Sequence, residues 1–381
     1  MVVAERAYWL AWLQISGVGP ILLQRLHHHF DNLSAAWVAA PRELQQIEGV
    51  GKQTLDKLLA DRDQIDPEEL LEKHLEQNPN FWTPVDPDYP ALLLEIPNPP
   101  PLLYYRGIVE PEENRGIKPS IAIVGTRYPS EYGRRWTRKI ASILTEQGFT
   151  IISGLAAGID AEAHRACLDV GGRTVAVFGT GVDLVYPKEN RNLAERILSQ
   201  GLVMSEYPAG TKPNAKHFPQ RNRIVAGLSR AVLVMEAPQK SGALITANIA
   251  NEFGRDVYVL PARLDDENSH GCLALIDKGG QVIPVDLDQL LQMLGAMPGL
   301  DRVSSEPESV RETEAVKREV PGLNLAPELA QVFAEVPGEP VVFDGIVQRT
   351  GLGTGTVSSA LLQLELMGLV KQVPGMRYQR V

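Results

Sequence analysis

The 381-residue sequence predicts an α/β protein built on one large parallel sheet, with a helical region before the sheet and a small domain after it. Three observations predict this fold class. Seven short apolar runs begin at intervals of 24–29 residues, and helical patterns fill the gaps between them. Both ends of the chain differ from the middle in their pattern of apolar residues. Strands that are apolar throughout are typical of a parallel sheet covered by helices on both faces.

Residues 1–83 are predicted to form a helical domain, because their apolar residues recur at spacings of three and four. Two glycine pairs, Gly17-Val-Gly19 and Gly49-Val-Gly51, lie 32 residues apart between helical patterns, an arrangement that resembles a tandem helix-hairpin-helix (SAM-like) module. Two interpretations stay open. In the first, the hairpin amides bind a DNA phosphate; in the second, the hairpins only pack together. The second is favoured, because Lys52 is the only basic residue directly after either hairpin.

Residues 84–297 are predicted to form the sheet domain. Its first part, residues 84–101, is rich in proline and is expected to be an extended connector without elements of its own. After it, strands alternating with helices predict an extended Rossmann-like parallel sheet core. The seven strands are expected to begin near Ile121, Thr150, Thr174, Leu202, Ala231, Asp256 and Gln281.

Residues 298–322 are rich in Glu, Ser, Arg and Pro, so a flexible linker is expected there. Residues 323–381 then show three helical patterns followed by two short strands around Pro374-Gly375, which predicts a winged-helix-like domain. The third pattern, Thr354–Met367, contains no Lys or Arg. This favours a protein contact or plain packing over reading of a DNA groove.

Glycine and small hydroxyl residues gather where the predicted strands end. They occupy 124–127, 153–158, 179–181 and 240–246. Backbone amides at such loops can approach an anion closely, although glycine there also serves tight turns. A P-loop is absent, and Arg127 stands where a dinucleotide fingerprint would need its second glycine, so neither ATP hydrolysis nor a bound dinucleotide is expected.

The most unusual segment is Lys216–Arg223, which places three positive charges and an aromatic residue within eight positions. Cations can hold a sugar–phosphate backbone while an aromatic ring stacks on an unpaired base, so the segment is typical of a single-strand binder. The competing interpretation is structural: Arg221 or Arg223 pairs with a carboxylate, and Phe218 belongs to the core.

Several motifs together resemble the DNA processing protein A (DprA/Smf) family. They are VGTR at 124–127, SGLAAGIDAEAH at 153–164, GTGVDLVYPKEN at 179–190, SEYPAGTKP at 205–213, HFPQRNRIVAGLS at 217–229, VMEAPQKSGALIT at 234–246 and HGCLALI at 270–276. The resemblance covers nearly the whole predicted sheet domain. One departure is Leu260-Pro261-Ala262-Arg263, where the family typically has Pro-Gly, so no site is carried over from that turn.

The resemblance implies a protein that binds and protects incoming single-stranded DNA and loads the RecA recombinase onto it in natural transformation. It also implies a homodimer formed through the Rossmann-like domain. Arg127 is the foremost phosphate contact by motif position, with Gly125 and Thr126 supplying backbone and hydroxyl donors. The full set of expected DNA-binding residues is Gly125, Thr126, Arg127, Gly154, Lys216, Phe218, Arg221 and Arg223.

No catalytic residue, metal site or cofactor is expected, because the spacing assembles no nucleophile, base and orienting group. An alternative is a nucleotide-binding enzyme of the lysine-decarboxylase-like phosphoribohydrolase type. Such an enzyme needs an acid soon after its glycine-rich turn, whereas the helix after Ser241-Gly242 has none before Glu252. A third hypothesis is a sheet scaffold for protein assembly.

Composition excludes a uniformly basic nucleic-acid coat protein, because the net charge is -10 and the pI is about 5.3. The average hides a basic stretch, however. Residues 118–230 hold 16 Lys+Arg against 9 Asp+Glu, a local balance of +7, so the remainder carries −17. Only two cysteines occur and no run of about 18 apolar residues exists, so a cytoplasmic protein without a membrane partner is expected.

Overall fold

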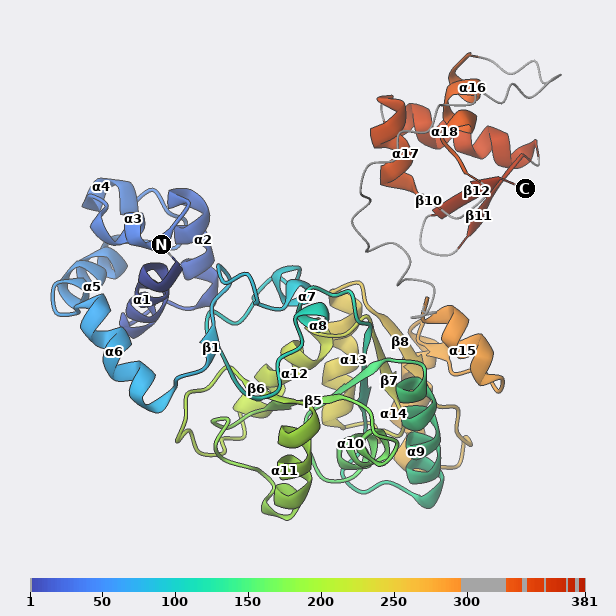
Figure 1. The fold of residues 1–381 in the computed structure, drawn as a ribbon, viewed down its shortest axis with the longest axis horizontal. Coiled ribbons are helices and arrows are strands. Elements are labelled where there is room, and N and C mark those ends of the chain that lie inside the picture. Colours follow the sequence, from blue (N-terminus) through green and yellow to red (C-terminus); the bar gives the residue numbers. More distant parts are fainter. Residues whose placement is uncertain are drawn as a thin grey trace, which may run out of the picture. The chain divides into compact units, whose positions relative to one another are not determined.

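The computed structural model describes residues 2–295, 327–337, 341–352, 354–367, 369–373 and 377–380. The chain divides into two compact units, Met1–Glu306 and Pro307–Val381, which are described separately here (Figure 1). The predicted linker, residues 298–322, lies outside the described residues. The division into four domains at 83/84, 297/298 and 322/323 therefore stays a prediction.

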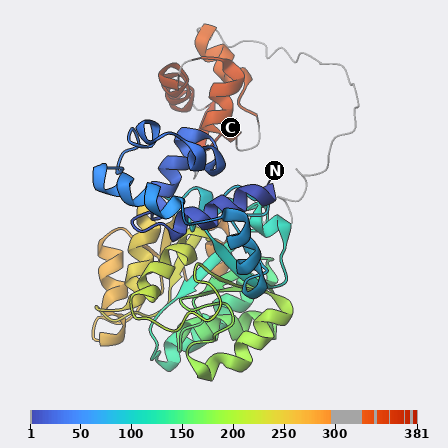
Figure 2. The ribbon, with the colours of Figure 1, turned by 90° about the vertical axis from the view of Figure 1, so that its left-hand side faces the viewer.

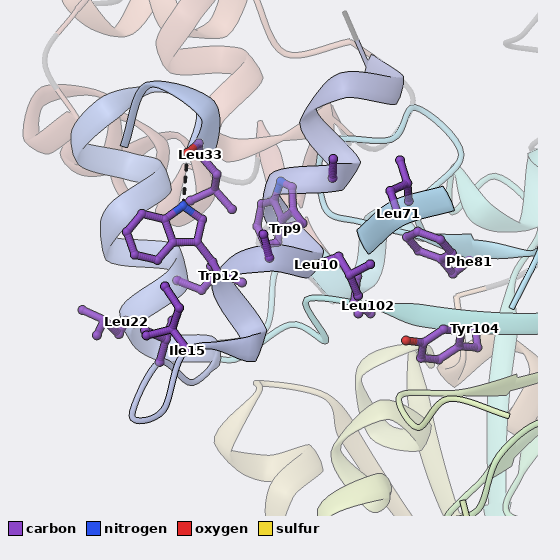
Figure 3. Close-up of a cluster of buried hydrophobic side chains, with 14 of the residues drawn as sticks. Trp9, Leu10, Trp12, Ile15, Leu22, Leu33, Leu71, Phe81, Leu102 and Tyr104 are labelled. Atoms are coloured by element: carbon purple, nitrogen blue, oxygen red, sulfur yellow. Dashed lines mark hydrogen bonds between the residues drawn. The ribbon is translucent and has the colours of Figure 1, made fainter. Parts of the chain in front are cut away.

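Six helices form the beginning of the first unit. They are α1 (Val2–Gln14), α2 (Pro20–Phe30), α3 (Leu33–Val38), α4 (Pro41–Leu44), α5 (Lys52–Arg62) and α6 (Pro67–Gln77). Gly17 and Gly49 both have positive φ, +94° and +97°, which explains why glycine stands in each of the two hairpins. Buried tryptophans organise the core between the helices. The Trp12 indole donates to the Leu33 carbonyl at 3.1 Å (Figure 3).

The helical layer and the sheet share one hydrophobic core. Leu10 and Leu71 pack with Phe81 and Tyr104, which lie on two strands at one edge of the sheet, β1 (Phe81–Trp82) and β2 (Leu103–Gly107) (Figures 2 and 3). An ion pair between Arg6 Nε and Asp86 Oδ1, at 2.8 Å, joins α1 to the segment after β1.

The proline-rich connector was predicted to lack elements, and this prediction was wrong. It contains α7 (Ala91–Leu94) and is followed directly by β2, and α8 (Pro111–Asn114) comes next along the chain. The side chain of Tyr89 is buried and its hydroxyl donates to the Pro100 carbonyl at 2.9 Å. Proline here limits the length of the elements rather than excluding them.

The sheet has nine strands in the order β1-β2-β6-β5-β4-β3-β7-β8-β9. At one edge β1 pairs antiparallel with β2, and β2 pairs antiparallel with β6. All other pairs, from β6 across to β9, are parallel. The seven parallel strands are those expected from the apolar runs. They are β3 (Ser120–Val124), β4 (Thr150–Ser153), β5 (Thr174–Phe178), β6 (Leu202–Ser205), β7 (Ala231–Val234), β8 (Asp256–Val259) and β9 (Gln281–Val282).

Helices cover both faces of the sheet, as the buried clusters show (Figure 1). One face carries α9 (Glu131–Glu146), α10 (Ile159–Asp169), α11 (Arg191–Gln200) and α15 (Leu287–Met293), and the other carries α12 (His217–Gly227), α13 (Gly242–Glu252) and α14 (His270–Asp277). The predicted extended Rossmann-like α/β core is therefore confirmed.

Strand order reverses between β3 and β7. The chain moves from β3 toward β6 in one direction, then returns to the other side of β3 for β7, β8 and β9. In open α/β sheets such a switch point leaves a crevice at the carboxyl ends of the two central strands, because their following loops diverge to opposite sides.

The second unit contains α16 (Pro327–Ala334), α17 (Phe343–Thr350) and α18 (Thr354–Leu366) with a three-stranded antiparallel sheet. Its strands follow the order β10 (Val341–Val342), β12 (Arg377–Arg380), β11 (Val370–Val373). The predicted winged-helix-like domain is confirmed, although the expected Pro-Gly turn lies outside the described residues. Among the described helices of either unit, none is both long enough and apolar enough to cross a membrane.

Candidate functional site

A pocket of about 600 Å³ lies at the switch point of the sheet. Its walls come from the loops after β3, β4, β5, β6 and β7 and from residues of α10, α12 and α13. The lining residues that carry charge, aromatic rings or small backbone loops are Gly125, Thr126, Arg127, Tyr128, Gly154, Ala156, Asp160, Tyr186, Phe218, Arg221, Lys240, Ser241, Gly242 and Thr246.

The loop after β3 is fixed by a buried carboxylate from the loop after the neighbouring strand, β7. Glu236 accepts from the Ser130 backbone N–H at 3.0 Å and from the Ser130 hydroxyl at 2.6 Å. Its own carbonyl accepts from the Thr126 N–H at 2.7 Å. The Thr126 backbone N–H is therefore already hydrogen-bonded within the protein. An anion at this loop could accept only from the neighbouring backbone N–H groups and from the Thr126 hydroxyl. Glu236 is thus a positioning residue that holds Arg127 and Tyr128 at the mouth of the pocket.

The loop after β4 packs directly against the loop after β3. Gly158 has a φ of +82°, and a Cβ there would lie 2.3 Å from the Thr126 carbonyl oxygen. A Cβ on Gly125 would lie 2.5 Å from Ile159 Cγ1. Both glycines are required by close approach of the two loops, which explains why small residues cluster at these strand ends.

Arg221 forms the floor of the pocket. It is 5% exposed, and its Nη1 donates to the Val177 carbonyl at 2.6 Å, while its Nε has no hydrogen-bond partner. A Cβ on Gly154 would lie 1.7 Å from Nη1, so the guanidinium occupies the space that a side chain at 154 would fill. Burial lowers the pKa of Arg221, nearby Asp160 opposes this, and the charge of Arg127 adds to it. Arginine nevertheless stays protonated at neutral pH.

Asp160 is the carboxylate among the pocket-lining residues. Its Oδ2 accepts from the backbone N–H groups of Gly154 at 3.1 Å and Ala156 at 3.4 Å, which orders the loop after β4. Burial raises the pKa of Asp160, and the charge of Arg221 opposes the rise. With Arg127, Arg221 and Lys240 against Asp160, the lining side chains carry a formal charge of +2.

Aromatic rings surround the mouth of the pocket. Tyr128 is 84% exposed, Tyr186 is exposed, and the rings of Tyr186 and Phe218 lie 5.5 Å apart at a tilt of 32°. A Cβ on Gly179 would lie 2.9 Å from the Phe218 ring, so that glycine makes room for it. An exposed tyrosine ring leaves apolar surface in water, and it can cover that surface by stacking against a planar ligand.

The N-terminus of α13 adds a further positive feature. Ser241 caps this 11-residue helix by accepting from the Ala243 N–H at 3.2 Å, and Gly242 lines the pocket. Unpaired amides and the helix dipole make such an end favourable for an anion. The pocket therefore combines three cations, a helix N-terminus and exposed rings, a set suited to phosphate groups joined to planar bases.

Six of the eight expected DNA-binding residues line the pocket: Gly125, Thr126, Arg127, Gly154, Phe218 and Arg221. The other two do not. Lys216 is an exposed residue at the N-cap of α12, outside the pocket wall. Arg223 is buried, with its guanidinium 2.7 Å from Glu206 and bonded to the Asn98 carbonyl at 3.2 Å. The structural interpretation of the segment thus applies to Arg223.

Sequence reasoning missed the two rim tyrosines. Tyr128 directly follows the VGTR motif, and Tyr186 lies within GTGVDLVYPKEN. The available signal was a tyrosine followed by proline in a loop after a strand, Tyr128-Pro129 and Tyr186-Pro187.

No acid–base pair forms between Asp160 and His164, although they are four residues apart on α10. His164 is fully buried, and its Nδ1 lies 2.7 Å from the Thr174 hydroxyl, which itself donates to the Ile151 carbonyl. Nδ1 therefore carries the proton that it donates to Thr174. Burial, together with the charges of Arg221 and Arg165, lowers the pKa of His164 to about 3.

The buried His164 predicts a loss of stability in acid. The unfolded chain takes up the proton near pH 6.5 and the folded chain only near pH 3. The free energy of unfolding is therefore unaffected by this histidine above pH 6.5 and falls as pH drops below that value. At pH 4.5 the loss amounts to about 3 kcal/mol. Thermal unfolding measured from pH 7 to 4.5 should show a steeper fall in Tm for the parent protein than for His164→Gln. Parallel Tm curves would contradict the assignment.

The fold and the pocket define a Rossmann-like protein with a cationic pocket at its switch point, whose lining is suited to phosphate groups. Residues 80–295 match the family model described as DNA recombination-mediator protein A, and residues 316–376 match the DprA winged helix domain. The chain belongs to the DNA recombination-mediator protein A family.

Three relatives illustrate this membership. Protein Smf of Synechocystis sp. is 52% identical over 398 aligned residues that cover both chains completely. The X-ray structure of DNA processing protein A (DprA) from Streptococcus pneumoniae has a TM-score of 0.64 and 34% identity, covering 80% of this chain and 99% of that one. A Helicobacter pylori DNA processing protein A structure, described as revealing a single-stranded DNA binding mode, has a TM-score of 0.50 and 29% identity, covering 56% and 95%.

Proposed function

We propose that this protein binds single-stranded DNA in the switch-point pocket. The observation that carries the proposal is the joint placement of Arg127, Arg221 and Lys240 with the exposed rings of Tyr128 and Tyr186 around one cavity. Cations neutralise the backbone, and rings stack only on bases that are not already stacked in a duplex. The Helicobacter pylori relative, whose structure concerns single-stranded DNA binding, supports the same ligand class.

We further propose the role expected from the sequence. The protein would protect incoming single-stranded DNA and load the RecA recombinase onto it in natural transformation, working in the cytoplasm as a homodimer formed through the Rossmann-like domain. The support is the family description, recombination mediator, because a mediator must hand a bound strand to a recombinase. Both cysteines are buried and unpaired, which fits a reducing compartment.

A binding role without catalysis fits the pocket better than phosphoribohydrolase chemistry. Hydrolysis at a ribose needs an acid free to act, and the carboxylate of Asp160 already accepts two loop amides. On α13 the first acid is Glu252, at the far end of the helix. Incubation with nucleoside monophosphates should release no free base, and release of base would favour the enzyme.

Arg127→Ala is expected to weaken binding of single-stranded DNA by about ten- to a hundredfold, because a charge-assisted phosphate contact is lost. The slope of log affinity against log salt should fall by about 0.7, the value of one contact on a single strand. Fluorescence anisotropy with a labelled oligothymidylate across a salt series measures both quantities. Duplex of the same length should bind more weakly.

Arg115→Ala provides the matched control. Arg115 is exposed and lies shortly before the amino end of β3, whereas the pocket lies at the carboxyl end of that strand. The substitution therefore removes the same charge at a site away from the pocket. Equal affinity for duplex and single strand, or equal losses in the two variants, would contradict the proposed site.

A further inference from the structure

A second concentration of positive charge lies on α9 and α10, outside the pocket. We call it the α9 cationic ridge and define it as Arg134, Arg135, Arg138 and Lys139 of α9 with Arg165 of α10. All five side chains reach solvent at least in part. The pocket does not use any of them.

Three of these arginines share one carboxylate. Glu162 of α10, 7% exposed, lies 2.7 Å from Arg138, 3.2 Å from Arg165 and 3.5 Å from Arg134. Arg138 also lies 4.0 Å from Glu131 of α9. Two negative charges do not neutralise three guanidinium groups, so the cluster retains a formal charge of +1. The three cations repel one another, and an external anion would relieve that repulsion.

The other two members lie over aromatic rings. The Arg135 guanidinium is 5.9 Å from the centre of the Tyr132 ring, and the Lys139 ammonium is 5.0 Å from that of Trp136. Within the described part of the chain neither has an ion-pair partner. A ring holds one side of a cation and leaves its remaining donors free, which is a suitable arrangement for a phosphate contact.

The ridge is continuous with the pocket mouth. Arg134 Nε donates to the Pro129 carbonyl at 3.3 Å, and Pro129 follows Arg127 and Tyr128 in the same loop. α9 begins at Glu131, directly after that loop, and runs away from the pocket. Arg134 to Lys139 span about 7.5 Å along the helix, so the cations extend from the mouth over the outer surface of the sheet domain.

We propose that the α9 cationic ridge binds the phosphate backbone of the DNA segment that leaves the pocket past Arg127. The inference rests on the proposed function, because it assumes a strand held in the pocket. The pocket fixes one end through cations and rings, and the ridge holds the emerging backbone through charge alone. Binding at the ridge therefore depends on strand length and salt, not on base identity.

The test compares Arg135→Gln/Lys139→Gln with the parent protein on two oligothymidylates, of about four and about twenty nucleotides. These two cations are chosen because their removal leaves Glu162 with all its partners. For the long strand at low salt we expect the affinity of the variant to fall about tenfold and its salt slope to decrease by about 1.4. The variant should bind the short strand, which fills only the pocket, as tightly as the parent protein does.

Lys73→Gln/Lys278→Gln serves as the control, since it removes two exposed charges from α6 and from the end of α14. Its affinity for both strands should be unchanged, and matching Tm values should show that all variants are folded. If the ridge variant binds the long strand like the parent while Arg127→Ala weakens both strands, the ridge proposal is overturned and the pocket stands. If the parent binds neither strand, both proposals are overturned.

Discussion

Gly154→Ala is expected to reduce the affinity for single-stranded DNA by about a hundredfold, as much as the loss of a central charged contact. The added Cβ would lie 1.7 Å from Arg221 Nη1 and 2.3 Å from its Cζ, so the guanidinium must leave its place on the pocket floor. Displacing it also breaks the 2.6 Å bond to the Val177 carbonyl. Overpacking of this kind lowers the free energy of unfolding by about 1–3 kcal/mol.

The matched control is Gly345→Ala in α17. A Cβ there would meet its nearest neighbour at 3.5 Å, an ordinary contact, and alanine favours a helix over glycine. DNA binding of this variant should equal that of the parent protein, and its Tm should be unchanged or higher. If Gly154→Ala binds as tightly as Gly345→Ala does, Arg221 is not the floor of the site.

The parallel strands could be predicted from sequence because each is buried on both faces, which leaves an uninterrupted apolar run. β1 and β2 could not. β1 has only two residues, and β2 reads Leu-Tyr-Tyr-Arg-Gly, in which the last two residues are exposed. β2 is placed by antiparallel pairing with β6 and β1 by pairing with β2, and both pack against α1 and α6. These contacts cross long sequence separations, so no local pattern contains them.

The segment Lys216–Arg223 shows the opposite limit. Its charged and aromatic residues were singled out from the sequence, but its helical structure was not, and most of it is the first part of α12. Proline at position 219 is tolerated because it lies in the first turn, where no backbone bond is lost. The two arginines of the segment also lie in different environments. Arg221 faces the pocket, whereas Arg223 meets Glu206, and the deciding partners come from other elements.

Convergence of the glycine-rich loops was predictable, because carboxyl ends of parallel strands share one edge of a sheet. The reversal of strand order between β3 and β7, which selects among those loops, was not readable from the sequence. It brings the loops after β3, β4 and β7 around one cavity. It also gives separate reasons for two glycines that looked alike: Gly154 makes room for Arg221, and Gly158 for a neighbouring backbone.

Arg221→Met is expected to cost about 1–3 kcal/mol of stability, because it breaks the bond to the Val177 carbonyl and removes a positive charge that favours the ionised form of buried Asp160. DNA binding should be lost at the same time. Asp160→Asn should also reduce stability, since buried Arg221 then loses a nearby negative charge that opposes the effect of its burial, although an amide oxygen can still accept from the Gly154 N–H. The double variant should lose about 2 kcal/mol less than the sum of the singles, a coupling that chemical denaturation would measure.

Binding should respond to these two single changes in opposite directions. Asp160→Asn raises the formal charge of the pocket lining from +2 to +3 and leaves Arg221 in place, so affinity for single-stranded DNA should be kept or increased. Arg221→Met lowers the same charge to +1 and should abolish tight binding. A purely structural Arg221 would instead make affinity follow stability, so that Asp160→Asn weakened binding too. Anisotropy titrations of both variants at a temperature well below their Tm separate the two cases.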